Sequence, residues 1–112
     1  MYRPILRIDS PAQNSVFAQR KNAVTGYVNI PRAQIQIFVR AGTLWYPQGV
    51  AFVNGKTWDR VCRFGDEQSA SGEYAVVAIA NGDIDMRKNY KTLPERGVRS
   101  NEVSVTLRKG LT

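Results

Sequence analysis

The side chains that could carry out covalent chemistry are few in this chain. Cys62 is the single cysteine, and the sequence contains no histidine, the residue that most often activates a nucleophile or binds a metal. Cys62 lies in an apolar stretch, where a thiol usually serves as a small core residue. A serine activated by a lysine would need a proximity that spacing does not show. We therefore predict that the chain is not an enzyme.

Acidic side chains offer one metal site to consider. Asp83 and Asp85 form a close pair that could bind calcium together with Asp66 and Glu67, because calcium prefers carboxylate oxygens. The spacing is not that of an EF-hand, and the pair directly follows an ordinary turn dipeptide. The sequence also contains no glycine-rich phosphate loop and no paired Cys or His set. We expect no metal and no cofactor.

Recognition is the chemistry that the remaining side chains favour, and the segment 82–100 is the first candidate. It lacks sustained periodicity, and compact domains rarely carry so long a connection without a reason. It carries five cations and three acids, and arginine and tyrosine are enriched at binding hot spots. Alternatively, the segment folds back over a sheet edge, anchored by Tyr90 and Leu93. Its candidate partner-binding residues are Arg87, Lys88, Tyr90, Lys91, Arg96 and Arg99.

A second candidate surface is aromatic. If Ile35 and Val39 face the core, Phe38 faces away from it, since neighbouring strand residues point to opposite sides. Trp45 and Tyr46 are consecutive, so at least one of these rings also points outward. An exposed aromatic platform can stack on sugar rings, nucleobases or a partner protein, whereas the alternative is ordinary cross-strand packing. The group comprises Phe38, Arg40, Trp45, Tyr46 and Phe52, of which the first four are the candidate partner-binding residues.

Strands must position both surfaces. The continuous apolar run from Ser71 to Asn81 has strand length and suits a strand covered on both faces. In the stretch 57–64 an inward-facing set of apolar residues is interrupted by Arg60, which predicts either a bulge or an arginine that reaches outward. Period-two alternation predicts further strands over 23–30, 33–40 and 101–109, with shorter ones near 3–8, 15–19, 44–46 and 50–53, and we place 3–8 and 15–19 on one sheet edge.

The number and spacing of these segments indicate the fold class. Roughly seven to nine short strands are separated by turn signals, and no stretch shows helical periodicity. The single long connection before the last strand suits a Greek key better than a barrel. We predict an all-β, antiparallel Greek-key sandwich that forms one domain over residues 1–112.

Several short motifs resemble those of bacterial immunoglobulin-like or fibronectin-type-III-like modules. The chain lacks the paired cysteines of antibody domains, and Trp58 lies on a later strand than their core tryptophan. The resemblance implies a disulfide-free bacterial or phage module with a binding or spacing role. It also implies that the Tyr74 hydroxyl folds back onto nearby backbone, as in the tyrosine corner. The motifs are DSPA at 9–12, VTGYV at 24–28, IQIFVR at 35–40, YPQG at 46–49, GKTW at 55–58, the run 74–80 and SNEVSV at 100–105.

The charge balance bears on partners and location. Sixteen Lys and Arg against nine Asp and Glu give a net charge of +7, which favours acidic partners. The cations form no dense run, so nucleic acid is a less favoured partner than protein. The sequence shows neither a secretory signal nor an apolar run of about 20 residues, so we expect no membrane span. We expect a cytoplasmic chain if the sequence is complete, and an unknown location if it is an excised domain.

These observations lead to a functional prediction. We expect a non-catalytic binding module that contacts another protein, or another domain of the same polypeptide, within a bacterial or phage assembly. The alternatives are a carbohydrate-binding module that uses the aromatic face and a basic nucleic-acid-binding domain.

Overall fold

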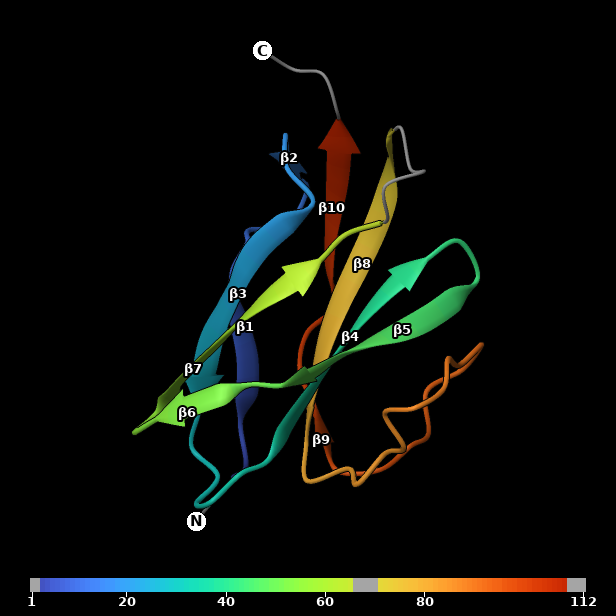
Figure 1. Ribbon diagram of the computed structural model, residues 1–112. Helices are drawn as coiled ribbons and strands as arrows, with labels where there is room; N and C mark the ends of the chain where they lie inside the picture. Colours follow the sequence, from blue (N-terminus) through green and yellow to red (C-terminus); the bar gives the residue numbers. More distant parts are fainter. Residues whose placement is uncertain (1–2, 66–70, 109–112) are drawn as a thin grey trace.

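The computed structural model describes residues 3–65 and 71–108, and every regular element within them is a β-strand. The strands form two sheets around a shared core (Figure 1). The first sheet has the order β1-β3-β7-β6, and the second has the order β2-β10-β8-β4-β5, with β9 paired to β8. The strands are β1 (Leu6–Ser10), β2 (Ser15–Phe17), β3 (Lys21–Val28), β4 (Ile35–Ala41), β5 (Leu44–Val50), β6 (Phe52–Asn54), β7 (Thr57–Arg63), β8 (Ser71–Ala80), β9 (Val98–Arg99) and β10 (Val103–Arg108).

The core between the sheets follows the alternation of the sequence. Val24, Gly26 and Val28 of β3 are buried, as are Val103, Val105 and Leu107 of β10, while the residues that alternate with them are only half-buried. The amide side chain of Asn101 also joins the two sheets, because its Oδ1 accepts a hydrogen bond from the Ile8 backbone of β1 at 2.9 Å. The all-β, two-sheet prediction is confirmed.

Strand β8 is buried on both faces, as its continuous apolar sequence predicts. Val76 and Ala78 belong to the core between the sheets. Val77 and Ile79 point to the other side of the strand and belong to a separate buried cluster. A second layer of protein must therefore lie over the outer face of this sheet.

That layer is residues 82–97, which we call the cover loop. It runs along the outside of the second sheet, in orange in Figure 1, and returns through β9 to β8. Its side chains Ile84 and Leu93 are buried against Phe38 of β4 and the outward residues of β8. The long connection thus has a structural role: it covers a sheet face that is too apolar to contact water.

Two assignments from the sequence need correction. Strand β2 is not a second piece of the edge formed by β1, because it pairs in parallel with β10 in the opposite sheet. This pairing also means that the fold is not purely antiparallel. Alternation shows which face a strand buries, but it does not show which sheet the strand joins.

The sequence left open whether β7 contains a bulge at Arg60 or whether the arginine side chain reaches outward. The pairing of β7 with β3 and β6 is regular, so no bulge is present there. The guanidinium reaches across to the end of β5, where it donates hydrogen bonds to the carbonyl oxygens of Gln48 and Val50. It packs against Gly49, where a Cβ atom would lie only 2.5 Å from the guanidinium carbon.

The backbone just upstream of Tyr74, at 66–70, where the expected tyrosine corner would find its partner, lies outside the described residues. Tyr74 is buried at the start of β8, but its hydroxyl makes no hydrogen bond within the described ranges 3–65 and 71–108. Its ring instead packs edge-on against Phe64, with 6.2 Å between the ring centroids. Tyr74 therefore contributes to the core by packing.

The return of the cover loop to the sheet depends on Gly97. This residue has a φ of +69°, and a Cβ atom there would lie 2.1 Å from the carbonyl oxygen of Ala80. Gly42, in the β4–β5 turn, has a similar φ of +64°, but no atom lies within 4 Å of its would-be Cβ. The two glycines share a backbone conformation and differ in the space around them.

We expect Gly97→Ala to lower the free energy of unfolding by roughly 3 kcal/mol or more, because steric overlap adds to the backbone strain. The matched variant Gly42→Ala carries only the strain of a left-handed backbone, about 1 kcal/mol. Urea unfolding of both variants measures the difference. Equal losses would show that the chain does not approach Gly97 this closely.

Candidate binding surfaces

The cover loop is held to β4 by a buried amide. Gln36 lies on the outward face of β4 and is only 4% exposed. Its Nε2 donates to the Ile84 carbonyl at 2.7 Å, and its Oε1 accepts from the Ile84 amide at 3.0 Å. One side chain thus satisfies both backbone groups of a buried loop residue, which would otherwise be costly to remove from water.

A second attachment joins the cover loop to the edge of the sheet. Trp45 of β5 and Tyr90 exchange two backbone hydrogen bonds, of 2.7 and 3.0 Å. The Tyr90 hydroxyl donates to the carbonyl of Asp85 at 2.7 Å, and its ring meets Phe38 edge-on. Together with the buried Leu93, these contacts make Tyr90 and Leu93 anchors of the loop, as the sheet-covering alternative predicted.

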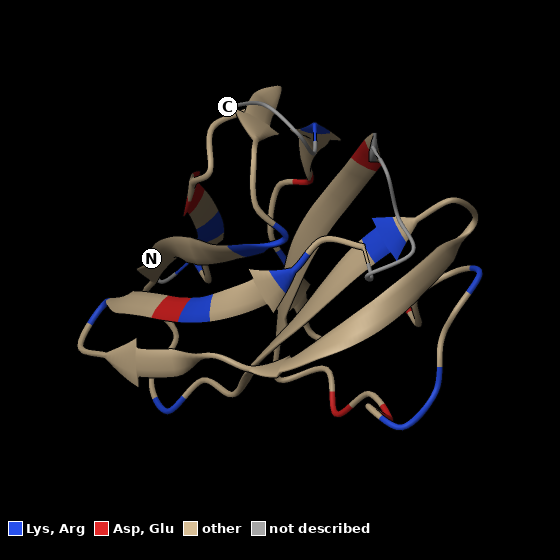
Figure 2. Cartoon of the chain, turned by 45° about the horizontal axis from the view of Figure 1, so that its top comes forward, with Lys and Arg blue, Asp and Glu red and all other residues tan. Residues whose placement is uncertain are grey.

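The outward side of the cover loop and of β9 carries the predicted cations. Arg87, Lys88, Lys91, Arg96 and Arg99 are all exposed, and Figure 2 shows the blue segments that follow this part of the chain. Tyr90 is only half-buried, but its contacts are internal. The structure therefore gathers five of the six loop candidates on solvent-facing positions and assigns the sixth a structural role.

These cations differ in how far they are neutralised. The Arg87 side chain and amide donate to the Asp85 carboxylate, and these hydrogen bonds hold the pKa of Asp85 below its ordinary value. The Lys88 ammonium lies 5.6 Å from the centre of the Tyr90 ring. Lys88, Lys91 and Arg96 form no ion pair within the described part of the chain. Their charge is therefore available to a partner.

The expectation of an exposed aromatic platform is wrong for two of its rings. Phe38 is fully buried and Trp45 is 7% exposed, because the cover loop lies over both. Arg40 lies 5.3 Å from the centre of the Trp45 ring and pairs with Glu102 at 3.6 Å. Tyr46 is 37% exposed but points to the other side of β5. This face therefore does not present the exposed rings that the predicted carbohydrate site needs for stacking on a sugar.

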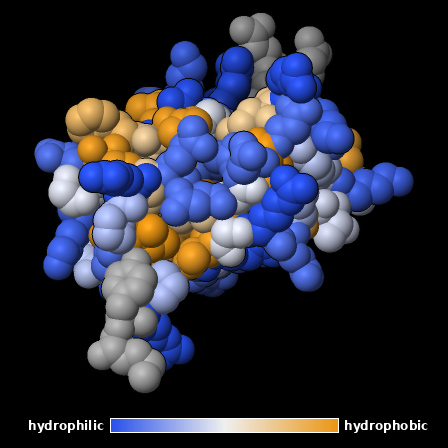
Figure 3. Space-filling view, turned by 90° about the horizontal axis from the view of Figure 1, so that it is seen from below, coloured by the Kyte–Doolittle hydropathy of each residue, from blue (hydrophilic) through white to orange (hydrophobic). Residues whose placement is uncertain are grey.

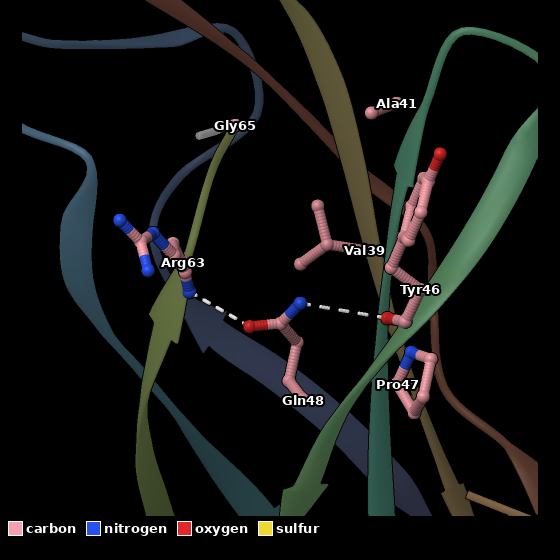
Figure 4. A pocket seen from close by; sticks show the side chains of 7 residues that line it. All are labelled: Val39, Ala41, Tyr46, Pro47, Gln48, Arg63 and Gly65. Carbon is pink, nitrogen blue, oxygen red and sulfur yellow. Dashed lines mark hydrogen bonds between the residues drawn. The ribbon is translucent and has the colours of Figure 1, made fainter. Parts of the chain in front are cut away.

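Tyr46 borders a pocket of about 400 Å³ at the side of the sandwich, between β5 and the end of β7 (Figure 4). The Gln48 side chain crosses it, accepting from the Arg63 amide at 2.8 Å and donating to the Tyr46 carbonyl. The Arg63 guanidinium points away from Tyr46 in this view. Among the described residues that line the pocket, Gln48 thus hydrogen-bonds to the backbone of Tyr46 and Arg63, and no acid lies beside a base.

The chemistry of Cys62 also argues against a catalytic role. The thiol is buried in the core, and this burial raises its pKa to about 12. No group of three or more Cys, Asp or Glu side chains that could hold a metal occurs among the described residues. The calcium ligands considered from the sequence include Asp66 and Glu67, which lie outside those residues.

Comparison with known proteins does not place this chain in a family. The sequence matches no model of a known protein family and no curated protein. In the described part of the chain, no helix is long and apolar enough to cross a bilayer.

We expect Gln36→Leu to lower the free energy of unfolding by about 2 to 4 kcal/mol, since it leaves the Ile84 amide and carbonyl buried without partners. Hydrogen exchange of the Ile84 amide should accelerate in the same variant. The matched variant Gln34→Leu, at an exposed position two residues away, should stay within about 0.5 kcal/mol of the unsubstituted chain. An unchanged exchange rate of the Ile84 amide would contradict the proposed attachment of the cover loop by Gln36.

Cys62 also predicts a pH dependence of stability. The folded thiol keeps its proton up to about pH 12, whereas the unfolded thiol loses it near pH 8.5. Above that pH the unfolded state alone is stabilised by ionisation, so the stability contributed by Cys62 declines as the pH rises. The stability advantage of the unsubstituted chain over Cys62→Ala should therefore shrink by roughly 1.9 kcal/mol between pH 8 and pH 10, measured by urea unfolding. A constant difference would mean that the thiol is accessible to water.

Proposed function

We propose that this chain is a non-catalytic binding module that contacts another protein, or another domain of the same polypeptide, through the outward side of the cover loop. The observation that carries the proposal is that the inward side of this loop is attached to the sheet, while its outward side presents cations to solvent. Its inward groups are fixed by Gln36, Trp45 and the buried cluster, while Lys88, Lys91 and Arg96 project without an ion-pair partner among residues 3–65 and 71–108. Loops on a rigid support are the usual place for recognition residues.

The rigidity of the support favours binding energetically. A loop that is already ordered loses little conformational freedom when a partner docks, so more of the contact energy appears as affinity. Exposed arginine and lysine around a half-buried tyrosine suit an acidic protein surface, and they raise the association rate by electrostatic steering. The partner surface is thus expected to be acidic.

The strand order supports an immunoglobulin-like assignment within this proposal. We infer that the orders β1-β3-β7-β6 and β10-β8-β4-β5 are the A-B-E-D and G-F-C-C′ orders of an immunoglobulin sandwich with Greek-key connections. A place in a bacterial or phage assembly, which the sequence motifs imply, belongs to the same proposal.

A mosaic surface favours protein over nucleic acid as the partner. In the space-filling view from below, hydrophilic side chains are interspersed with apolar ones (Figure 3). Nucleic-acid sites instead concentrate cations along the path of the phosphates, and their affinity depends strongly on salt.

Charge reversal at the loop tests the proposal. We compare the unsubstituted chain with Lys88→Glu/Lys91→Glu/Arg96→Glu and with the matched control Arg3→Glu/Lys21→Glu/Lys56→Glu, which changes the net charge equally at exposed positions away from the loop. Proteins captured from extracts of the source cells are quantified by mass spectrometry after nuclease treatment. We expect the loop variant to lose at least one retained protein by tenfold or more, and the control variant to keep it.

Two outcomes would contradict the proposal. Equal recovery by all three chains would show that the cover loop does not bind the partner. Equal loss from both variants, or retention that nuclease abolishes, would show that net charge or nucleic acid accounts for the binding.

A further inference from the structure

The outer face of the first sheet, away from the cover loop, carries a groove of about 320 Å³. Its floor includes Trp58, whose indole fills the space that a side chain at Gly26 would occupy. Around this floor stand one aromatic ring and a set of polar side chains. The groove residues used in the argument are Asp9, Thr25, Phe52, Asn54, Thr57 and Asp59.

Strand register places these side chains beside one another. Phe52 of β6 lies opposite Asp59 of β7, and Asp59 lies opposite Thr25 of β3. Asn54 lies opposite Thr57 in the neighbouring row. Adjacent strands are about 4.8 Å apart, so the row from Phe52 to Thr25 extends about 10 Å across the sheet.

Phe52 is the most exposed large apolar side chain in the described part of the chain, at 68%. It extends from a strand of three residues and contributes nothing to the buried clusters. A ring in this position offers a flat apolar surface to a ligand beside the groove.

Several polar groups in the groove have unused hydrogen-bonding capacity. The side chains of Asp59, Asn54 and Thr25 make no hydrogen bond or ion pair with residues 3–65 or 71–108. Asp9 is paired with Arg7, and the Thr57 hydroxyl donates to the Asn54 carbonyl. A carboxylate accepts hydrogen bonds, an amide donates and accepts them, and a hydroxyl does both.

This combination discriminates between ligand classes. An anionic ligand would meet the carboxylates of Asp9 and Asp59, and a metal ion would find too few ligands among the described residues. An apolar protein surface laid over Phe52 would strip water from the adjacent Asp59 carboxylate without replacing its hydrogen bonds, which is costly. A sugar ring has an apolar C–H face that stacks on an aromatic ring and hydroxyl groups that donate to a carboxylate.

We propose that this groove binds a neutral saccharide. Phe52 stacks on one sugar ring, Asp59 accepts hydrogen bonds from its hydroxyl groups, and Asn54 and Thr25 bind hydroxyls of the same or the next ring. The site lies on the sheet opposite the cover loop, so it is separate from the surface proposed for a protein partner.

Calorimetric titration of the full chain tests the site. The probes are neutral hexasaccharides of glucose, xylose, mannose and N-acetylglucosamine, and at least one should bind with a Kd in the millimolar range or below. We expect Phe52→Ala to weaken that binding at least tenfold and Asp59→Asn at least fivefold. The control variant Val61→Ala removes another exposed apolar side chain, on β7 outside the groove, and should leave the affinity unchanged.

The two tryptophans report where the ligand binds. In a ¹H–¹⁵N spectrum, the Trp58 indole N–H beneath the groove should shift on titration, and that of Trp45 under the cover loop should not. The cover-loop charge reversals should leave saccharide affinity intact, which separates this site from the proposed protein contact. Absence of heat with every probe, equal affinity in Phe52→Ala, or stronger binding to polygalacturonate than to neutral sugars would overturn the proposal.

Discussion

The burial of both faces of β4 and β8 is the constraint on which the rest of this structure depends. Phe38, Val77 and Ile79 lie on the side of the sheet that faces away from the sandwich core, and they would expose a large apolar surface if nothing covered them. The cover loop meets this need, but its inward residues bring polar backbone groups into an apolar environment. The Gln36 amide and the paired Trp45 and Tyr90 backbones supply the missing hydrogen bonds.

This arrangement links the architecture to the two proposed surfaces. Anchoring the inward side of the cover loop leaves its cations on a fixed support, so a partner would meet a formed surface rather than a fluctuating one. The first sheet needs no such cover, because most of its outward residues are polar and most of its apolar residues face the core. Its outer face therefore stays open, and Phe52 stands on it beside Asp59.

Much of the fold could be predicted from residue types, and the candidate sites only in part. Period two identified the inward faces of β3 and β10, and the continuous run of β8 indicated burial on both sides. Nothing in the type of Gln36 separates it from a solvated glutamine, since its burial depends on a loop some fifty residues later. The burial of Phe38 has the same cause. The Asn54-Gly55 signal predicts a hairpin, but the observed turn lies one residue later, at 55–56, and this shift is what sets Phe52 opposite Asp59. The groove beneath them depends on how Trp58 fills the space at Gly26.

The pairing of Tyr90 with Trp45 has a consequence for the solubility of the chain. Among the edge strands of the two sheets, β5 is the longest. An unprotected edge of that length favours pairing with a strand of another molecule and growth into aggregates. Tyr90 occupies the hydrogen-bonding groups of Trp45, and Pro47 offers no amide proton further along. The other edge strands among the described residues are β1, β2, β6 and β9, each of five residues or fewer. The segment that shields an apolar face thus also blocks the most favourable route to polymerisation.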